Sequence, residues 1–260
     1  MWNGCIVVRR VGSHGFAYEL DHLSRSRHVP RVIFSDTELS AHQSIVHGFT
    51  STVDGAGEPL NLGVGSTEPD WGRAAHALGA PHMGVAFVSQ VHGDGVLWAE
   101  NPGLIGEADA LLSRTPGLLV AVRTADCVPI LVVGKSVVGA IHAGWRGLAA
   151  GVIPAAISEL ADDGPLYAVV GPAICVECYE VGEEVVDGIS RWIHPNEFVR
   201  RHNEKAHVDG GAAAVAQLRS AGVQRVSRIV ACTRCDERLW SHRQQGPAAG
   251  RQAGIVGLRC

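Results

Sequence analysis

Short runs of β-branched and aliphatic residues alternate with helical patterns along most of this chain, and this alternation limits the folds open to it. Glycine, proline and polar residues separate the segments. The alternation predicts one α/β domain. The predicted strands are residues 84–89, 118–123, 128–133, 137–141, 166–170 and 228–231. The predicted helices are residues 71–78, 153–160, 183–193 and 212–221.

The first 45 residues follow neither the helical nor the strand period. A compact apolar pattern begins only at Val46-His47-Gly48-Phe49. The 260 residues are enough for one to two domains, and no repeat or low-complexity linker divides them after residue 46. We therefore expect an N-terminal extension of undetermined order over residues 1–45 and one α/β domain over residues 46–260.

The charge and hydropathy of the chain exclude several classes of partner. Lys and Arg total 22 against 26 Asp and Glu, a net charge of −4, so no basic field is available for a nucleic-acid backbone. The apolar runs are much shorter than the ~20 residues that a membrane-spanning helix needs. We expect a cytoplasmic protein without nucleic-acid or membrane partners, and the sequence leaves its oligomeric state open. Seven cysteines, an odd number, favour thiols or metal ligands over a disulfide framework.

A predicted hairpin places a cysteine opposite a histidine. Two β-rich runs flank Gly134-Lys135, and glycine at the first central position suits a two-residue type II′ turn. Counting outward from this turn pairs Val133 with Ser136, and Cys127 with His142. Paired residues of an antiparallel ladder have Cβ atoms about 4.5–5.5 Å apart, so a thiolate and an imidazole there reach one zinc ion. The spacing predicts half of a metal site.

Two further features lie near strand ends. His92 follows the predicted strand 84–89, where α/β folds place site residues, and it is the third candidate ligand. Spacing alone does not direct it toward Cys127. The segment Ala143-Gly144-Trp145-Arg146-Gly147 leads into a helical pattern, and a helix start beside Arg146 favours an anion such as phosphate.

Six motifs occur in the order of a known family. They are Gln90-Val91-His92-Gly93, Ala108-Asp109-Ala110-Leu111, Thr124-Ala125-Asp126-Cys127-Val128-Pro129, His142-Ala143-Gly144-Trp145-Arg146-Gly147, Gly171-Pro172-Ala173-Ile174 and Tyr179-Glu180-Val181-Gly182. Through these motifs the chain resembles the YfiH-like laccase-domain proteins over about residues 46–260. This family is also called the polyphenol oxidase or purine nucleoside phosphorylase family.

The resemblance implies a three-layer α/β/α fold with a mixed sheet and a metal centre made by His92, Cys127 and His142, which are also the expected catalytic residues. It implies a zinc-dependent purine nucleoside phosphorylase for adenosine, inosine and methylthioadenosine that also deaminates adenosine. The expected partners are therefore a purine nucleoside and phosphate. Zinc is the expected cofactor, with copper ranked below it.

Substrate binding is expected from Gln90, Arg146 and Arg243. The chain departs from the family pattern where Thr52 replaces an arginine that holds substrate or phosphate, which puts phosphate affinity in question. Near the C-terminus, Ser241-His242-Arg243-Gln244 keeps one arginine of the family's Ser-Tyr-Arg-Arg, and Gly250-Arg251 keeps its Gly-Arg pair. Arg123 is either a further substrate contact or a solvated strand end.

Several alternatives remain open at this point. Cys127 with His142 as its base also suits a hydrolase that edits peptidoglycan precursors. A copper polyphenol oxidase needs many clustered histidines, and no His-x-His pair occurs in the sequence. A binding module that has lost its phosphate contacts is a further possibility. Separately, Cys175-x-x-Cys178 and Cys232-x-x-Cys235 have zinc-ribbon spacing within each pair, with small core thiols as the simpler interpretation.

Overall fold

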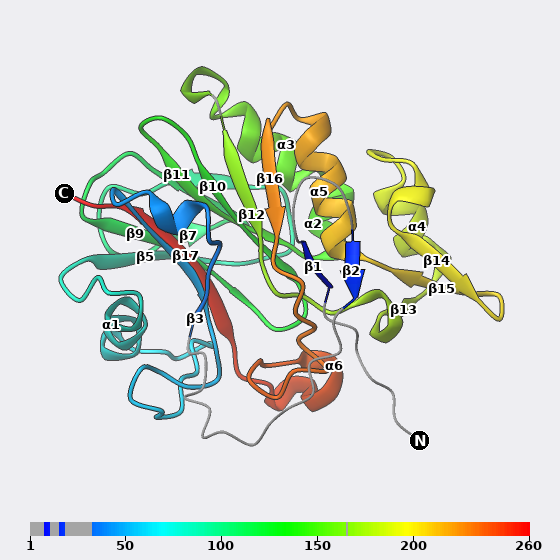
Figure 1. Ribbon diagram of the computed structural model, residues 1–260, viewed down its shortest axis with the longest axis horizontal. Helices are drawn as coiled ribbons and strands as arrows, with labels where there is room; N and C mark the ends of the chain where they lie inside the picture. The colour runs from blue at the N-terminus through cyan, green and yellow to red at the C-terminus, as the bar shows by residue number, and fades with distance from the viewer. Residues whose placement is uncertain (1–7, 11–15, 19–32, 165) are drawn as a thin grey trace.

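The computed structural model describes residues 8–10, 16–18, 33–164 and 166–260 (Figure 1). Two six-stranded sheets pack face to face at its centre, and helices cover the outer face of each sheet. Both sheets contain parallel and antiparallel neighbours. The predicted α/β class with mixed strand pairing is confirmed, and the β layer between the helices is two sheets thick.

The first sheet has the order β16-β12-β10-β11-β8-β6, antiparallel in its centre with one parallel pair at each edge. Its strands are β6 (Val96–Trp98), β8 (Ala110–Ser113), β10 (Val128–Val133), β11 (Val138–Ala143), β12 (Tyr167–Val170) and β16 (Arg225–Arg228). The helices packed on it are α2 (Trp145–Ala150), α3 (Val152–Ser158), α4 (Glu183–Ile189) and α5 (Gly210–Ser220).

The second sheet has the order β3-β4-β17-β9-β5-β7, and α1 (Glu68–Ala77) covers its outer face. Its strands are β3 (Ile33–Phe34), β4 (Ile45–Thr50), β5 (Gly84–Ser89), β7 (Gly103–Glu107), β9 (Leu118–Thr124) and β17 (Gln252–Leu258). The smaller elements are the paired β1 (Val8–Arg10) and β2 (Phe16–Tyr18), the three-stranded sheet of β13 (Glu180–Val181), β15 (Lys205–Val208) and β14 (Val199–His202), and α6 (His242–Gln245).

Burial on both faces explains the unbroken apolar run of β9. Val120 and Val122 point into the core between the two sheets, whereas Leu119 and Ala121 point into the core beneath α1. A strand covered on both sides has no solvent face, so its sequence shows no alternation of apolar and polar residues. This strand is therefore visible in the sequence as a continuous hydrophobic stretch.

Most of the predicted elements agree with the structure within a few residues. Strands 84–89 and 128–133 are confirmed at both ends. The strand predicted at 228–231 is wrong beyond Arg228, because β16 occupies Arg225–Arg228 and the following residues turn to pair Cys232 with Ala173. Helix α4 ends four residues before the predicted position 193, because the Trp192 indole turns to donate a hydrogen bond to the Ala149 carbonyl.

The predicted hairpin exists, but its two-residue turn is wrong. Strands β10 and β11 pair Val133 with Val138 and Pro129 with His142, so the turn spans residues 134–137. Gly134 donates its backbone N–H to the Val137 carbonyl and thereby closes this longer turn. The register differs from the predicted one by two residues, and a shift of two leaves every side chain on its original face.

Residues before position 46 also contact the core. Strand β3 pairs with β4, and Leu39 is buried. The Asp36 carboxylate accepts a hydrogen bond from the Tyr167 hydroxyl at 2.8 Å. The predicted boundary between an extension over residues 1–45 and a domain over 46–260 stays a prediction. None of the helices among the described residues is long and apolar enough to cross a membrane.

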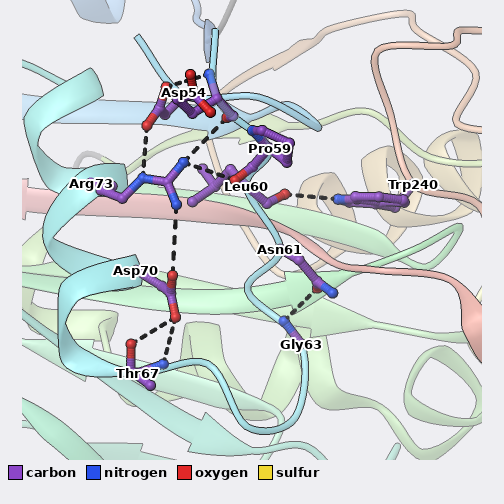
Figure 2. Close-up of polar contacts among 10 residues, drawn as sticks. Asp54, Pro59, Leu60, Asn61, Gly63, Thr67, Asp70, Arg73 and Trp240 are labelled. Carbon is purple, nitrogen blue, oxygen red and sulfur yellow. Dashed lines mark hydrogen bonds and ion pairs between the residues drawn. The ribbon is translucent and has the colours of Figure 1, made fainter. Parts of the chain in front are cut away.

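A buried carboxylate fixes the loop between β4 and α1, which borders the candidate site. Arg73 of α1 donates to the Asp54 carboxylate at 2.7 Å and to the Pro59 carbonyl at 2.8 Å (Figure 2). The Trp240 indole donates to the Leu60 carbonyl at 3.0 Å and ties the same loop to a distant part of the chain. Burial raises the pKa of Asp54, but hydrogen bonds from Arg73 and from two backbone amides outweigh burial and lower it overall.

We expect Asp54→Asn to reduce the free energy of unfolding by about 1–2 kcal/mol at neutral pH, because Arg73 loses its charged partner at a partly exposed pair. Because the pKa of Asp54 is lower in the folded protein than in the unfolded chain, its ionised carboxylate stabilises the fold at pH values above the unfolded-state pKa. This stabilisation is lost as the pH falls through the pKa of the folded protein. The difference from the unmodified protein should therefore shrink below pH ~4. Denaturant titration across pH measures it, with exposed Glu100→Gln as the control.

Candidate metal centre

Three side chains that are distant in sequence converge at one end of the two sheets. His92 follows β5, Cys127 precedes β10, and His142 lies near the end of β11. The His92 Nε2 and Cys127 Sγ atoms are 3.9 Å apart, and one ligand atom from each of the three residues lies within 4.8 Å of the others. The structure therefore brings together the three predicted ligands. Because the hairpin register slipped by two residues, Cys127 and His142 meet diagonally and not as a direct pair.

A buried carboxylate orients two of these residues. Asp109 has no exposed surface, and its Oδ1 lies 2.7 Å from His142 Nδ1. The same carboxylate accepts the backbone N–H groups of His92 at 3.0 Å and Gly93 at 2.7 Å. This arrangement leaves His142 Nε2 for a ligand and holds the loop that carries His92. Burial opposes ionisation of Asp109, but the hydrogen bond to His142 and the two amides lower its pKa overall.

The backbone beside the ligands adopts conformations that few residues accept. His92 has φ 62° and Asp126, next to Cys127, has φ 90°. The Asp126 carboxylate accepts hydrogen bonds from the Thr233 hydroxyl and the Arg243 backbone amide, both at 2.6 Å. A left-handed non-glycine residue costs on the order of 1–3 kcal/mol and persists only where surrounding contacts hold it. These contacts fix the direction in which Cys127 points.

Glycine is required directly beside the three ligands. A Cβ atom at Gly144 would lie 2.8 Å from the His92 ring and 3.1 Å from the Cys127 sulfur. Both distances are shorter than ordinary van der Waals contact. Position 144 therefore leaves open the space into which His92 and Cys127 point.

The thiol and the imidazole shift each other's ionisation. Burial alone would raise the pKa of Cys127, but His142 and His92 together lower it to about 6. Burial alone would lower the pKa of His142, but Cys127 and Asp109 raise it to about 9. The lowered pKa of Cys127 favours its thiolate form. A thiolate is the form of cysteine that binds metal.

The three residues line a cavity of about 760 Å³ that also contains aromatic and cationic side chains. Tyr179 and Trp145 supply ring surface, and Arg123 and Arg251 supply positive charge. In the described part of the chain, neither guanidinium has a carboxylate within ion-pair distance. Burial first, and then the charge of Arg251, lower the pKa of Arg123. The cavity is therefore suited to an anion close to the ligand cluster.

Two of the three predicted substrate-binding residues, Gln90 and Arg243, line the cavity, and Arg146 does not. Gln90 lines the cavity, but its amide exchanges hydrogen bonds with the backbone of Arg123 at 2.7 and 2.8 Å. Arg243 lines the cavity and stacks over Tyr179, with its guanidinium 5.3 Å from the ring. Arg146 is exposed, stacks over Trp145 and is not among the cavity-lining residues. The substrate roles of all three stay predictions.

The donor set fits a zinc ion. With Zn–S near 2.3 Å and Zn–N near 2.0–2.1 Å, tetrahedral ligands place sulfur and nitrogen about 3.6 Å apart. The observed 3.9 Å between His92 and Cys127 is close to this value. Three protein ligands leave a fourth position for water or substrate, which is the pattern of catalytic zinc sites. The three residues therefore suit zinc in number and in donor chemistry, and the spacing of His92 and Cys127 is close to that of a tetrahedral site.

The roles of Asp109 and Arg251 do not follow from the sequence alone. Asp109 lies in one of the six family motifs, but an isolated Asp gives no sign that it is buried or which ring it contacts. A carboxylate partner could have been expected on chemical grounds, because a metal-binding histidine almost always donates its other ring N–H to a carboxylate or a carbonyl. Arg251 was noted only within the Gly250-Arg251 pair, and its position in the cavity depends on the central placement of β17.

We expect Asp109→Asn to weaken zinc binding about 10- to 100-fold, because the amide no longer fixes the protonated nitrogen of His142. Competition with a chromophoric chelator measures this affinity. Asp94→Asn, an exposed neighbour, is the control and should bind zinc like the unmodified protein. An unchanged zinc affinity in a folded Asp109→Asn variant would contradict the proposed role of the carboxylate.

The chain is similar to several known proteins. A purine nucleoside phosphorylase of Deinococcus radiodurans is 34% identical over 83% of this chain and 90% of its own length. An adenosine deaminase named RL5, from an unknown prokaryote, is 36% identical over 58% of this chain and 63% of its own. The crystal structure of YlmD from Geobacillus stearothermophilus has a TM-score of 0.77 and 27% identity, and the match covers 89% of this chain and 100% of that one.

The family model described as multi-copper polyphenol oxidoreductase laccase matches residues 66–259. This match covers well over half of the chain and contains His92, Cys127 and His142. The resemblance to laccase-domain proteins is thereby confirmed. The chain belongs to the multi-copper polyphenol oxidoreductase laccase family.

Proposed function

We propose that this protein is a zinc-dependent purine nucleoside phosphorylase that accepts adenosine, inosine and methylthioadenosine and also deaminates adenosine. The observation that carries the proposal is the meeting of His92, Cys127 and His142 in one cavity with three guanidinium groups. These belong to Arg123, Arg243 and Arg251, and none of them has a carboxylate within ion-pair distance among the described residues. The similarity to relatives named purine nucleoside phosphorylase and adenosine deaminase supports it.

Phosphate is proposed to bind between Arg123 and Arg251. Arg123 donates to the Val88 carbonyl at 3.0 Å and lies over the Phe87 ring, which fix its position. Arg251 is held by the Ala249 and Gly250 carbonyls at 2.6 and 2.8 Å. Guanidinium groups match the geometry of phosphate oxygens. Thr52, which stands where the family has an arginine, is not a lining residue, and Arg123 and Arg251 are proposed to supply the anion contacts within the cavity.

In phosphorolysis, a phosphate oxygen forms a bond to the anomeric carbon of the ribose while the bond from that carbon to the purine nitrogen breaks. Holding phosphate against the nucleoside supplies much of the rate, because a bimolecular encounter becomes an intramolecular step. Tyr179 and Trp145 offer apolar surface to the purine. A zinc ion bound by His92, Cys127 and His142 would supply a Lewis acid, which serves water activation in deamination and polarisation of a substrate atom.

Asp109 is proposed to act on the reaction through His142. Its carboxylate accepts a hydrogen bond from Nδ1–H and keeps the imidazole in the tautomer that presents Nε2 to the metal. Asp109 is therefore a positioning residue and does not touch the substrate.

We expect His92→Ala and His142→Ala to lose nearly all phosphorolysis and deamination, because each removes one of three ligands. A chromatographic assay of adenosine, inosine and methylthioadenosine, with zinc and with or without phosphate, separates free purine from the deaminated nucleoside. Exposed His82→Ala is the control for loss of a histidine. Full phosphorolysis by His142→Ala with zinc supplied would refute the proposal.

The same samples separate the alternatives that the sequence left open. Iodoacetamide alkylates thiols. If it inactivates the enzyme even when zinc is bound, the result would favour Cys127 as the nucleophile of a hydrolase. Sustained oxygen uptake by the copper-loaded protein would favour a polyphenol oxidase. Calorimetric binding of adenosine without any product would favour a binding module.

We expect Arg251→Gln to raise the KM for phosphate roughly 10- to 100-fold, because a hydrogen bond to a charged group contributes about 1.5–3 kcal/mol. The KM for the nucleoside should change much less, since the substitution removes an anion contact. Initial rates measured with varied phosphate at saturating inosine, and with varied inosine at saturating phosphate, give the two KM values. Arg146→Gln is the matched comparison. If it raises the KM for phosphate more than Arg251→Gln does, the anion site would instead lie at the start of α2, beside Arg146.

A further inference from the structure

A second group of metal-ligating side chains lies outside the candidate centre. Cys175 and Cys178 belong to the loop after β12, and Cys232 and Cys235 belong to the loop after β16. These pairs are 57 residues apart in sequence, yet all four sulfur atoms lie within 4.8 Å of one another. The fold brings the pairs together because β12 and β16 are parallel neighbours, so their following loops leave the same edge of the sheet.

The distances between the sulfur atoms suit a shared ion. Four sulfurs at about 2.3 Å from a zinc ion are about 3.8 Å from one another in a tetrahedron. Cys178 Sγ and Cys235 Sγ are 3.4 Å apart, close to this spacing and well beyond the ~2.05 Å of a disulfide bond. Two Cys-x-x-Cys pairs that face each other form the usual frame of a structural zinc site.

The backbone of the two loops is shaped around these sulfurs. Ala173 pairs with Cys232 in a parallel bridge, and the Cys175 amide donates to the Cys232 sulfur at 3.3 Å. Within each pair the second cysteine donates its backbone N–H to the carbonyl of the first, at 3.0 Å for Cys178 and 3.2 Å for Cys235. These tight turns direct both sulfurs of a pair to the same side.

We propose that Cys175, Cys178, Cys232 and Cys235 bind a second zinc ion whose role is structural. Four thiolates complete the tetrahedral coordination, so no position remains for water or substrate. Arg234 forms a hydrogen bond with Cys178, and its positive charge offsets part of the negative charge of four thiolates around one divalent ion. This second centre is separate from the one made by His92, Cys127 and His142.

The second zinc would fix the wall of the candidate centre. Thr233, between Cys232 and Cys235, donates to the Asp126 carboxylate at 2.6 Å. Ile174, next to Cys175, donates its backbone N–H to the Asp126 carbonyl at 3.0 Å. Asp126 has φ 90° and directly precedes Cys127. Zinc that joins the two loops therefore holds the strained residue that positions a ligand of the first centre.

The test is the zinc content of protein purified in reductant, measured by elemental analysis and native mass spectrometry. We expect two zinc ions per chain in the unmodified protein and one in Cys178→Ser. The double variant His92→Ala/Cys127→Ser should also retain one, and its cobalt-substituted form should show the intense charge-transfer absorption of a tetrathiolate site. That variant isolates the second centre whether or not the proposed nucleoside activity is correct.

Two further variants control the experiment. Cys260→Ser removes an exposed cysteine outside both groups and should keep two zinc ions. Cys235→His should also keep two, because three cysteines and one histidine still bind zinc, and it tests ligation if Cys178→Ser does not fold. The proposal would be overturned if the His92→Ala/Cys127→Ser variant contained no zinc. In that case the four cysteines of the second centre would react as free thiols or would form two disulfides.

Discussion

The candidate centre depends on one buried carboxylate. Asp109 joins the His92 loop, which follows a strand of one sheet, to His142, which lies on a strand of the other. A buried charge of this kind is stable only when its hydrogen-bonding capacity is filled, and here three backbone amides and an imidazole fill it. These partners therefore cannot move independently, and the relative placement of the two sheets at this end becomes part of the geometry of the site.

The sheets form the core of the protein, and the loops at their ends carry the residues of the candidate site. The stacked sheets supply a largely apolar interior, in which Phe49 fills the space left by Gly171 and Gly254. The polar chemistry lies where strands end and loops begin, which is where ligand sites of α/β proteins generally form. A flat ring against two glycines brings the sheets close together, so the ligands carried by each sheet meet across a short distance.

The sequence predicted the α/β class, most buried strands and the proximity of Cys127 to His142, since each of these depends on local hydrophobic pattern. The hairpin register was wrong by two residues, but an even shift preserves the face, so the two side chains still met. Strand β17 was missed because Gly254 and Gly257 dilute its apolar signal. The burial of Asp109, the cavity position of Arg251 and the stacking of Arg146 on Trp145 depend on long-range packing, which a local pattern does not contain.

The position of β17 has a consequence for how the chain is made. Among the described strands it comes last in the sequence, yet it lies between β4 and β9 in the interior of its sheet. During synthesis the facing edges of β4 and β9 stay open until this segment leaves the ribosome, and open strand edges invite association with other chains. The guanidinium of Arg251 also enters the cavity only then. The second sheet and the cavity lined by Arg251 are therefore complete only after β17 has been made.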